Sequence, residues 1–315
     1  MRTQMDRNEH DIRIDIGVCT YRRTELEQTL RSLGAIAVPE GATIRIIVAD
    51  NDEVPSAEGR VNALRASVPH EIVYVHCPSS NISIARNACL ENATGDFLAF
   101  IDDDETASEN WIVRLIEAAD ATEADVVLGP VKAVYDKDAP GWMRRGDFHS
   151  TFPVWVGDRI VTGYTCNALL RLAAPSLAGR RFNLALGRSG GEDTEYFTHM
   201  HRMGGKIGYA PAAWVQEPVP AKRAAFSWLA KRKFRFGQTH GHLIEAGSGL
   251  ARKIRQLAFA SAKGGYCAIA AAAFLFSPVR RNQYILRASL HAGVVVGLLG
   301  MREIEQYGAA EARSS

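Results

Sequence analysis

Residues 95–105 read GDFLAFIDDDE, an apolar run that leads directly into four consecutive acids. Short apolar runs of about four to eight residues are typical of strands that are buried on both faces, as in a parallel sheet. Four adjacent carboxylates repel one another and reduce stability unless a positive group lies among them. The stretch therefore predicts a buried strand over 96–101 whose carboxyl end carries a cation-binding acidic cluster.

The acids of this cluster, Asp102, Asp103, Asp104 and Glu105, offer only oxygen atoms as ligands. Hard divalent cations such as Mg²⁺ and Mn²⁺ prefer oxygen ligands and are often shared with a substrate phosphate. In the alternative interpretation, the acids form a solvated loop and cap the helix expected at 108–119. That alternative fits poorly with acids at the carboxyl edge of a parallel sheet, where ligands bind. We therefore expect a Mg²⁺ or Mn²⁺ site here.

Strands and helices alternate on both sides of this stretch. Hydrophobic periodicity predicts strands at 12–19, 43–49, 71–76, 96–101 and 124–134, and helices at 24–36, 56–67, 82–92 and 108–119. Farther along we expect a strand at 160–171, a helix after Gly190-Gly191 and another at 225–243. Such alternation predicts an α/β fold with a mostly parallel sheet flanked by helices.

Three candidate site residues lie near the ends of predicted strands or at the start of a helix. Thr20 follows the first strand and Asp50 follows the second. An Asp at this edge can accept hydrogen bonds from a nucleobase or ribose, or it can form an Asx turn, which is common after strands. Arg86, near the start of the helix 82–92, can meet a phosphate or can tie the acidic cluster to the fold.

A second group of acids follows a flexible stretch. The sequence Gly190-Gly191-Glu192-Asp193 places two acids at the start of a predicted helix. Asp193 can act as a general base if a reacting hydroxyl lies within hydrogen-bonding reach. It can also simply cap the helix, since Asp is a good N-cap residue. Taken alone, the residues favour the cap.

The composition is that of an ordinary globular protein: 315 residues, 47% hydrophobic and 23% charged. Five cysteines are scattered without a CxxC pair, which argues against a zinc ribbon or a thioredoxin-like site and predicts free thiols. The polar stretch 1–13 has no apolar segment, so no secretory signal is expected. The first strand is not followed by GxGxxG, and no strand by GxxxxGK[ST], which argues against a Rossmann dehydrogenase and a P-loop enzyme.

Charge is distributed unevenly along the chain. Residues 1–221 contain 22 Lys and Arg against 31 Asp and Glu, whereas residues 222–315 contain 15 against 4. An acidic body with a basic tail predicts an anionic partner, either a nucleic acid or a membrane surface. A metal-dependent nucleotidyltransferase or nuclease that binds nucleic acid through its tail is therefore an alternative function.

The C-terminal region combines basic, aromatic and apolar segments. Aromatic residues are interleaved with its cations: Phe226, Trp228, Phe234 and Phe236. The runs 264–279 and 288–300 carry no charge, but each is shorter than the roughly 20 residues of a membrane-spanning helix. Interfacial helices bury aromatic residues and keep cations at the head groups, so we expect membrane association. A core helix with a solvated basic face is the alternative.

The motifs occur in a distinctive order: CTYRR at 19–23, ADND at 49–52, NISIARN at 81–87, GDFLAFIDDDE at 95–105 and GGEDTEY at 190–196. In this order they resemble the family 2 glycosyltransferases of the GT-A fold, over roughly residues 12–240. Further motifs, among them GDFHST and EPVP, resemble the rhizobial succinoglycan glucosyltransferases of that family. The resemblance implies a GT-A catalytic domain over 1–221 and a helical, membrane-associating extension over 222–315.

The resemblance also implies roles for the donor-binding residues. Thr20 and Asp50 would contact the uracil and ribose of a UDP-sugar. Asp102, Asp103 and Asp104 would form the DXD motif of the family. Within it, Asp103 would lie near the ribose, and Asp102 and Asp104 would bind the Mg²⁺ or Mn²⁺ ion.

The remaining roles concern catalysis. Arg86 would help to hold the nucleotide or the acidic cluster, and Asp193 would be the catalytic base. The acceptor hydroxyl would attack opposite the departing UDP, so the configuration at the anomeric carbon inverts and the product is β-linked. Members of the family often have a histidine just before EPVP, where this chain has Gln216. The third metal ligand is therefore open, with Glu217 as a substitute.

The resemblance finally implies partners and a location. The donor would be UDP-glucose, and the acceptor a polyprenyl-diphosphate-linked oligosaccharide of exopolysaccharide biosynthesis. Because that carrier lies in the membrane, we expect the enzyme on the cytoplasmic face of the bacterial inner membrane, in contact with the membrane surface and not with nucleic acid. The loop 179–191 would close over the donor and exclude water.

Overall fold

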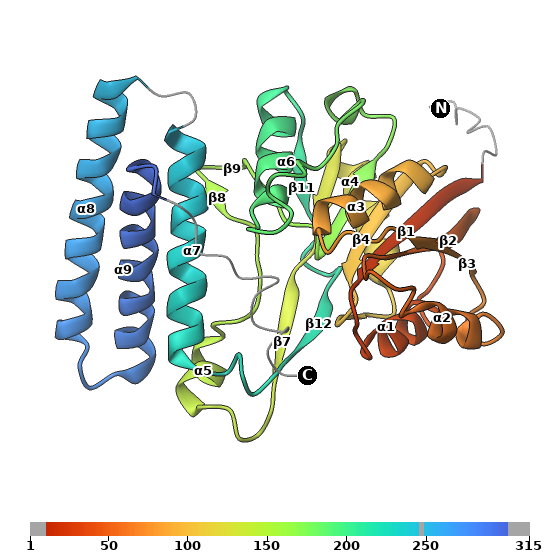
Figure 1. Cartoon of the computed structure of the whole chain (residues 1–315), viewed down its shortest axis with the longest axis horizontal. Coiled ribbons are helices and arrows are strands. Elements are labelled where there is room, and N and C mark those ends of the chain that lie inside the picture. Colours follow the sequence, from red (N-terminus) through yellow and green to blue (C-terminus); the bar gives the residue numbers. More distant parts are fainter. Residues whose placement is uncertain (1–10, 246–248, 302–315) are drawn as a thin grey trace, which may run out of the picture. The chain divides into compact units, whose positions relative to one another are not determined.

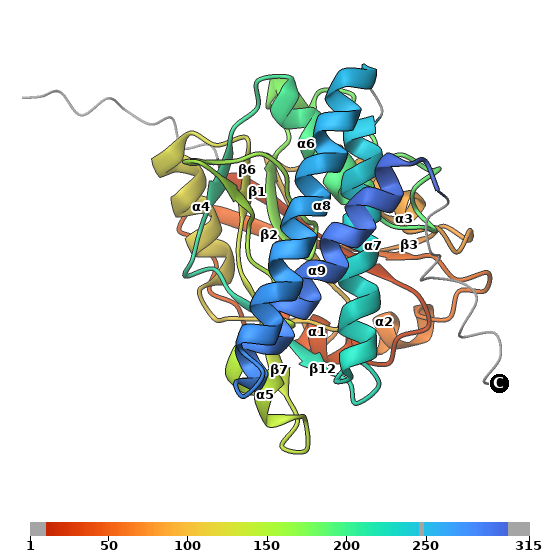
Figure 2. The same cartoon turned by 90° about the vertical axis from the view of Figure 1, so that its left-hand side faces the viewer.

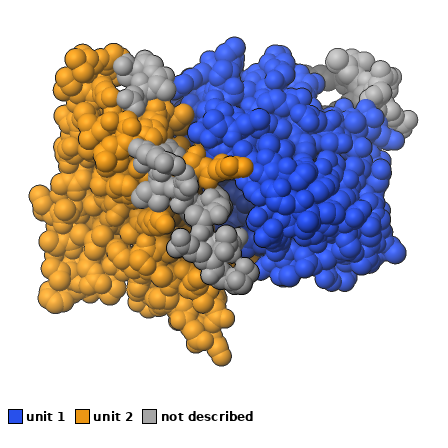
Figure 3. Space-filling view, in the orientation of Figure 1, with its two compact units in different colours: residues 1–132, 151–187, 192–217 blue, residues 133–150, 188–191, 218–315 orange. Residues whose placement is uncertain are grey.

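The computed structural model describes residues 11–245 and 249–301, and it divides into two compact units (Figures 1 and 3). The first unit comprises residues 1–132, 151–187 and 192–217, and the second comprises 133–150, 188–191 and 218–315. The second unit thus takes in two segments that lie well before the expected boundary at 221. Parts of the N-terminal and C-terminal predictions, at 1–10 and 302–315, lie outside the described residues.

The first unit is built on a seven-stranded sheet with the order β11-β6-β10-β4-β1-β2-β3. Its strands are β1 (Ile12–Thr20), β2 (Ala42–Asp50), β3 (Glu71–His76), β4 (Phe97–Asp102), β6 (Val126–Leu128), β10 (Asn167–Arg171) and β11 (Ile207–Tyr209). All neighbouring strands are parallel except β10, which runs antiparallel to β4 and β6. The predicted α/β class with a mostly parallel sheet is confirmed.

Helices and two smaller sheets accompany the seven-stranded sheet. The helices are α1 (Leu26–Leu33), α2 (Glu58–Leu64), α3 (Ile82–Asn92), α4 (Trp111–Thr122), α6 (Glu192–Arg202) and the 3₁₀ helix η1 (Pro175–Leu177). A three-stranded sheet has the order β5 (Thr106–Ala107), β12 (Val215–Val219) and β7 (Val131–Tyr135), and β8 (Trp155–Val156) pairs with β9 (Arg159–Ile160).

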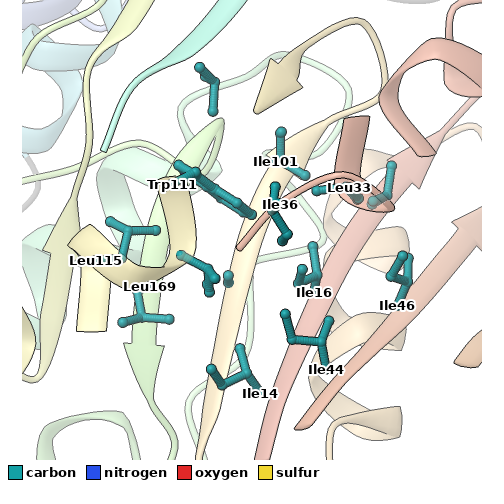
Figure 4. Packing of buried hydrophobic residues seen from close by; sticks show 14 of the residues in the cluster. Ile14, Ile16, Leu33, Ile36, Ile44, Ile46, Ile101, Trp111, Leu115 and Leu169 are labelled. Atoms are coloured by element: carbon teal, nitrogen blue, oxygen red, sulfur yellow. The ribbon is translucent and has the colours of Figure 1, made fainter. Parts of the chain in front are cut away.

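Burial along β4 shows how the sheet is covered on both faces. Ala99 and Ile101 belong to a core shared with α1, α2 and α4, where Trp111 is fully buried (Figure 4). Leu98 and Phe100 belong to a second core shared with α3 and α6. Successive side chains of a strand point to opposite faces, so one continuous apolar run supplies both cores. The two cores together fix β4, and with it the acidic cluster that follows.

Two predicted strands differ from the structure. The strand expected at 124–134 is divided at Gly129-Pro130 into β6 of the large sheet and β7 of the three-stranded sheet. A Cβ at Gly129 would collide with the carbonyl oxygen of Ala213, and Pro130 has no N–H to continue the ladder. The strand expected at 160–171 is shorter in the structure, since only Asn167–Arg171 joins the large sheet as β10.

The second unit is helical. It contains α5 (Gly141–Gly146), α7 (Phe226–Glu245), α8 (Leu250–Ala273) and α9 (Pro278–Leu298). The helix α9 packs against both α7 and α8, and Figure 2 views the three helices from the side of α8. The uncharged run 264–279 covers the end of α8 and the turn into α9, and the run 288–300 covers the end of α9. Within the described residues, no helix combines the length and the apolar character needed to cross a membrane.

Glycines set the distance between α7 and α9. Gly237 and Gly241 of α7 face α9, and Gly293 and Gly297 of α9 face α7. A Cβ at Gly293 would collide with the carbonyl oxygen of Phe234, and the three other glycines meet backbone atoms of the facing helix in the same way. Pairs of small residues four apart allow two helix backbones to approach this closely.

We expect Gly293→Ala to lower the free energy of unfolding by about 1–3 kcal/mol, the usual cost of overpacking, because the added methyl meets backbone that cannot rotate away. Urea unfolding followed by circular dichroism measures the change.

Gly265→Ala is the matched control. No atom lies within 4 Å of the position that its Cβ would occupy on α8. Alanine favours a helix by about 0.5–1 kcal/mol over glycine, so this variant should be slightly more stable than the wild type. Equal stability of the two variants would show that α7 and α9 are farther apart than described.

Candidate active site

The register of the central strands brings the predicted donor-binding residues to one edge of the sheet. Thr20 pairs with Asp50 across β1 and β2, and Cys19 pairs with Asp102 across β1 and β4. The Thr20 hydroxyl donates a hydrogen bond of 2.7 Å to Oδ2 of Asp103. Because β1 lies between β2 and β4, the ends of three strands meet where the acidic cluster begins.

The acids of the cluster are held largely out of water. Burial raises the pKa of Asp102 to about 7, with Arg86 opposing the shift, and burial with the nearby Asp104 raises the pKa of Asp103 to about 7. Arg23 partly balances this charge, with guanidinium nitrogens 4.0 Å from Asp103 Oδ1 and 3.7 Å from Asp104 Oδ2. The site therefore stores negative charge that a cation would relieve.

Glu105, which the sequence already placed in the acidic cluster, and Cys166, which no motif indicated, complete a possible metal-binding group with Asp102. Ligand atoms of Asp102, Glu105 and Cys166 all lie within 4.8 Å of one another. Burial, followed by the charge of Asp102 and Glu217, raises the pKa of Glu105 well above its usual value. Burial likewise raises the pKa of the Cys166 thiol, so the effective donors are carboxylate oxygens. Such a donor set fits Mg²⁺ or Mn²⁺.

Asp104, an expected metal ligand, and Gln216 and Glu217, the candidates near the third ligand position, lie in different surroundings from the group above. Asp104 is not part of the group formed by Asp102, Glu105 and Cys166, and its carboxylate approaches Arg23. Gln216 is exposed on β12, whereas Glu217 is half-buried and its charge raises the pKa of Asp102 and Glu105. Alternation along β12 thus turns Glu217, rather than Gln216, toward the acids.

Asp50 is fully buried and forms an Asx turn, which was one of the two interpretations of this residue from the sequence. Its Oδ2 accepts hydrogen bonds from the Ala57 N–H at 2.8 Å and the Tyr74 hydroxyl at 2.7 Å. Its Oδ1 accepts from the Asp52 N–H at 3.1 Å, the i to i+2 contact of such a turn. Asp50 therefore lies beside Thr20 as expected, but both of its oxygens hold the segment 50–57 in place.

Arg86 forms a buried ion pair that could not be read from the sequence. Its Nη1 donates to Oε1 of Glu192, and its guanidinium lies 5.6 Å from the centre of the Phe182 ring. Burial lowers the pKa of Arg86, but the carboxylates of Glu192, Asp193 and Asp102 outweigh it, so the pKa is raised. The second oxygen of Glu192 is buried without a hydrogen-bond partner among the described residues. Arg86 thus ties α3 to the first turn of α6.

Asp193 is the second residue of α6 and is half-buried. Since the helix begins at Glu192, Asp193 lies in the first turn and not at the N-cap position. The helix follows Gly190 and Gly191, whose φ angles of 89° and 93° lie in the region that favours glycine. In the second unit, Arg235 donates to the carbonyl oxygen of Ser189 at 2.7 Å, a contact that no motif indicated.

Comparison with known proteins identifies the class. A model of glycosyl transferase family 2 matches residues 15–175. The chain therefore belongs to this family and is a glycosyltransferase, so the nucleotidyltransferase or nuclease alternative is wrong. It is 62% identical over 305 residues to the succinoglycan biosynthesis protein ExoM of Rhizobium meliloti (strain 1021), which covers 96% of this chain and 98% of ExoM.

More distant proteins are similar in structure or in part of the sequence. S. aureus TarS 1–349 in complex with UDP-GlcNAc superposes with a TM-score of 0.53 at 15% identity, over 95% of this chain and 98% of TarS 1–349. A glucosyl-dolichyl phosphate glucuronosyltransferase of Haloferax volcanii is 28% identical over 138 residues, 42% of this chain and 41% of that protein. The predicted GT-A fold and family 2 membership are confirmed.

We expect Arg86→Met to lower the free energy of unfolding by about 3–5 kcal/mol, because it leaves the buried Glu192 carboxylate uncompensated. The double variant Arg86→Met/Glu192→Leu should recover most of that loss, since an apolar pair needs no compensation. Thermal or urea unfolding of the wild type, the two single variants Arg86→Met and Glu192→Leu, and the double variant measures both values. A double variant no more stable than Arg86→Met would contradict the pairing.

The raised pKa of Asp103 predicts a pH-dependent effect of Asp103→Asn. The folded-state pKa of about 7 exceeds the unfolded value of about 3.9, so the folded protein binds the additional proton between these pH values. The wild type therefore loses stability as the pH rises from about 4 to about 7. In EDTA, Asp103→Asn should gain on the order of 1–4 kcal/mol relative to the wild type between pH 4 and pH 8. A difference independent of pH would contradict the shift.

Proposed function

We propose that this glycosyltransferase inverts configuration and transfers glucose from a UDP-sugar to a lipid-linked oligosaccharide during succinoglycan-type exopolysaccharide biosynthesis. The observation that carries the proposal is the edge where Thr20 and the acids after β4 meet. The pathway is supported by 62% identity to a succinoglycan biosynthesis protein over nearly the whole chain. A UDP-sugar donor is supported by the likeness to TarS 1–349, whose structure contains UDP-GlcNAc.

The donor site lies along the ends of β1, β2 and β4. The Thr20 hydroxyl and the Asp103 carboxylate, already hydrogen-bonded at 2.7 Å, face the ribose and uracil. Asp50 contributes by holding the segment 50–57, the wall of this site, through its three hydrogen bonds. A polar wall fixed before the donor arrives reduces the ordering cost of binding.

The metal-binding residues of the proposal are Asp102 and Asp104, with Glu105 and Glu217 nearby. Mg²⁺ or Mn²⁺ bound there would neutralise negative charge on the leaving UDP. The raised pKa values of Asp102 and Glu105 are the physical support, because these acids are held out of water and lie close to other carboxylates. Arg23, beside Asp103 and Asp104, and Arg86, which lowers the pKa of Asp102, supply fixed positive charge from the chain itself.

The transfer step uses one base. The acceptor hydroxyl oxygen forms a bond to the anomeric carbon while the bond from that carbon to the diphosphate oxygen breaks. The hydroxyl proton passes to Asp193, and UDP leaves on the opposite face with the electron pair. A single displacement inverts the configuration, so an α-linked donor gives a β-linked sugar. Arg86 and Glu192 hold the first turn of α6, where this base lies.

The proposed acceptor determines where the enzyme works. A polyprenyl-diphosphate carrier lies in the membrane, so the enzyme works at the cytoplasmic face of the inner membrane. The net positive charge of the C-terminal region supports contact with an anionic lipid surface.

Asp193→Asn tests the proposed base. Asparagine keeps the size and hydrogen-bonding capacity of Asp193 but does not take up a proton, so turnover should fall by roughly 10²–10⁴-fold. The affinity for UDP-glucose should stay within about twofold, because Asp193 is not assigned to donor binding. Transfer to a lipid-linked acceptor and calorimetric titration with UDP-glucose measure the two quantities. Near-normal transfer would exclude Asp193 and leave Glu192 as the next candidate.

Two further variants complete this experiment. Asp104→Asn should show the reverse pattern, with loss of the Mg²⁺- or Mn²⁺-dependent part of UDP-glucose binding. Glu195→Gln is the matched control on α6, since Glu195 pairs with Arg180 and has no role in the proposed step. Its turnover should stay close to that of the wild type.

A further inference from the structure

The outer face of α8 is apolar and exposed. One side of α8 packs on α9 through Ala260, Cys267 and Ala271, which are buried. Outside that buried stripe α8 exposes Leu250, Ile254, Phe259, Tyr266 and Ile269, and the turn that follows exposes Leu275 and Phe276. Together these seven residues are called the α8 face below. Ile269 is 74% exposed and Phe276 is 100% exposed, so no described residue covers them.

This pattern differs from that of an ordinary surface helix. A helix on the surface of a globular protein normally has charged or polar residues opposite its buried stripe. From residue 264 to residue 279 the chain has no charged residue on either side. Exposed contiguous apolar surface of this kind marks an interaction site.

Cations border the α8 face, and acids are absent from the sequence around it. Residues 249–301 contain seven Lys and Arg and neither Asp nor Glu. On α8, Arg252, Arg255 and Lys263 are exposed, and on α9 Arg280 and Arg287 are exposed. The surface thus combines apolar side chains with positive charge of a single sign.

We propose that the α8 face docks on an anionic lipid surface, with the apolar residues at the boundary of head groups and acyl chains and the cations among the head groups. This arrangement is the one that interfacial amphipathic helices adopt. The inference deepens the proposed function by naming the surface through which the enzyme meets the membrane of its acceptor.

The combination of charge and apolar side chains favours a lipid surface over a second copy of the chain or a nucleic acid. Two copies joined through their α8 faces would bring the same seven cations together, with no acid in residues 249–301 to pair with them. A nucleic acid would use the cations but would gain little from exposed Ile269 and Phe276. An anionic bilayer accommodates both kinds of side chain at once.

Vesicle sedimentation of the full chain tests the proposal. Vesicles of phosphatidylcholine alone are compared with vesicles that also contain one quarter phosphatidylglycerol, at low salt and at 0.5 M salt. We expect the wild type to sediment with the anionic vesicles at low salt and to be released by high salt, because screening weakens attraction between charges. Wild-type protein that stays in the supernatant with anionic vesicles at low salt would overturn the proposal.

The variant Ile269→Ser/Phe276→Ser removes the apolar part of the face. Both side chains are largely exposed, so the fold should be unaffected, and binding to anionic vesicles should weaken by at least tenfold. Val38→Ser/Met203→Ser is the matched control, since it changes two exposed apolar residues of the first unit. Equal weakening by both variants, or none by the first, would overturn the assignment. A change of oligomeric state in the first variant would identify the face as a contact between copies and also overturn it.

A third measurement keeps this test separate from that of the proposed function. Calorimetric titration with UDP-glucose should give the same affinity for the wild type and for Ile269→Ser/Phe276→Ser. Wild-type protein that binds UDP-glucose but no anionic vesicles would reject the docking surface alone. Vesicle binding that depends on the α8 face, without sugar transfer to any lipid-linked acceptor, would reject the proposed function and leave the docking surface intact.

Discussion

Repulsion among the carboxylates after β4 is the constraint on which the site depends. Asp103 and Glu105 are buried, Asp102 is half-buried, and burial raises the pKa of each. Such a cluster persists only because the rest of the first unit holds it, with apolar cores on both faces of β4 and the Thr20 hydroxyl hydrogen-bonded to Asp103. Relief of this repulsion favours a cation that binds there.

Much of the fold could be predicted because its signals are local. The apolar run 97–101, the alternation of strands and helices, and the helix at 82–92 are all properties of neighbouring residues. The break of the predicted strand 124–134 has a local cause, Pro130, and a distant one, the carbonyl of Ala213, which leaves no room for a Cβ at Gly129. The close approach of α7 and α9 has the same origin, since glycines some fifty residues apart must meet.

The site residues also differ in whether local sequence signals could predict them. Thr20, Asp50 and Asp102 follow strands, so their common edge could be predicted from the parallel sheet alone. The pairing of Arg86 with Glu192 joins residues of two helices that are far apart in the sequence, and no spacing rule reveals it. The use of both Asp50 oxygens within the turn also depends on Tyr74, which reaches Asp50 from β3.

The glycine contact between α7 and α9 limits how the C-terminal helices can diverge. Enlarging any one of the four glycines requires the two backbones to separate, which would remove the other three close approaches as well. Replacing them one at a time would pass through destabilised intermediates. Descendants of this chain would therefore retain all four glycines or rebuild the whole contact with matched larger residues. The four glycines are thus expected to be kept or replaced together, although they belong to two separate helices.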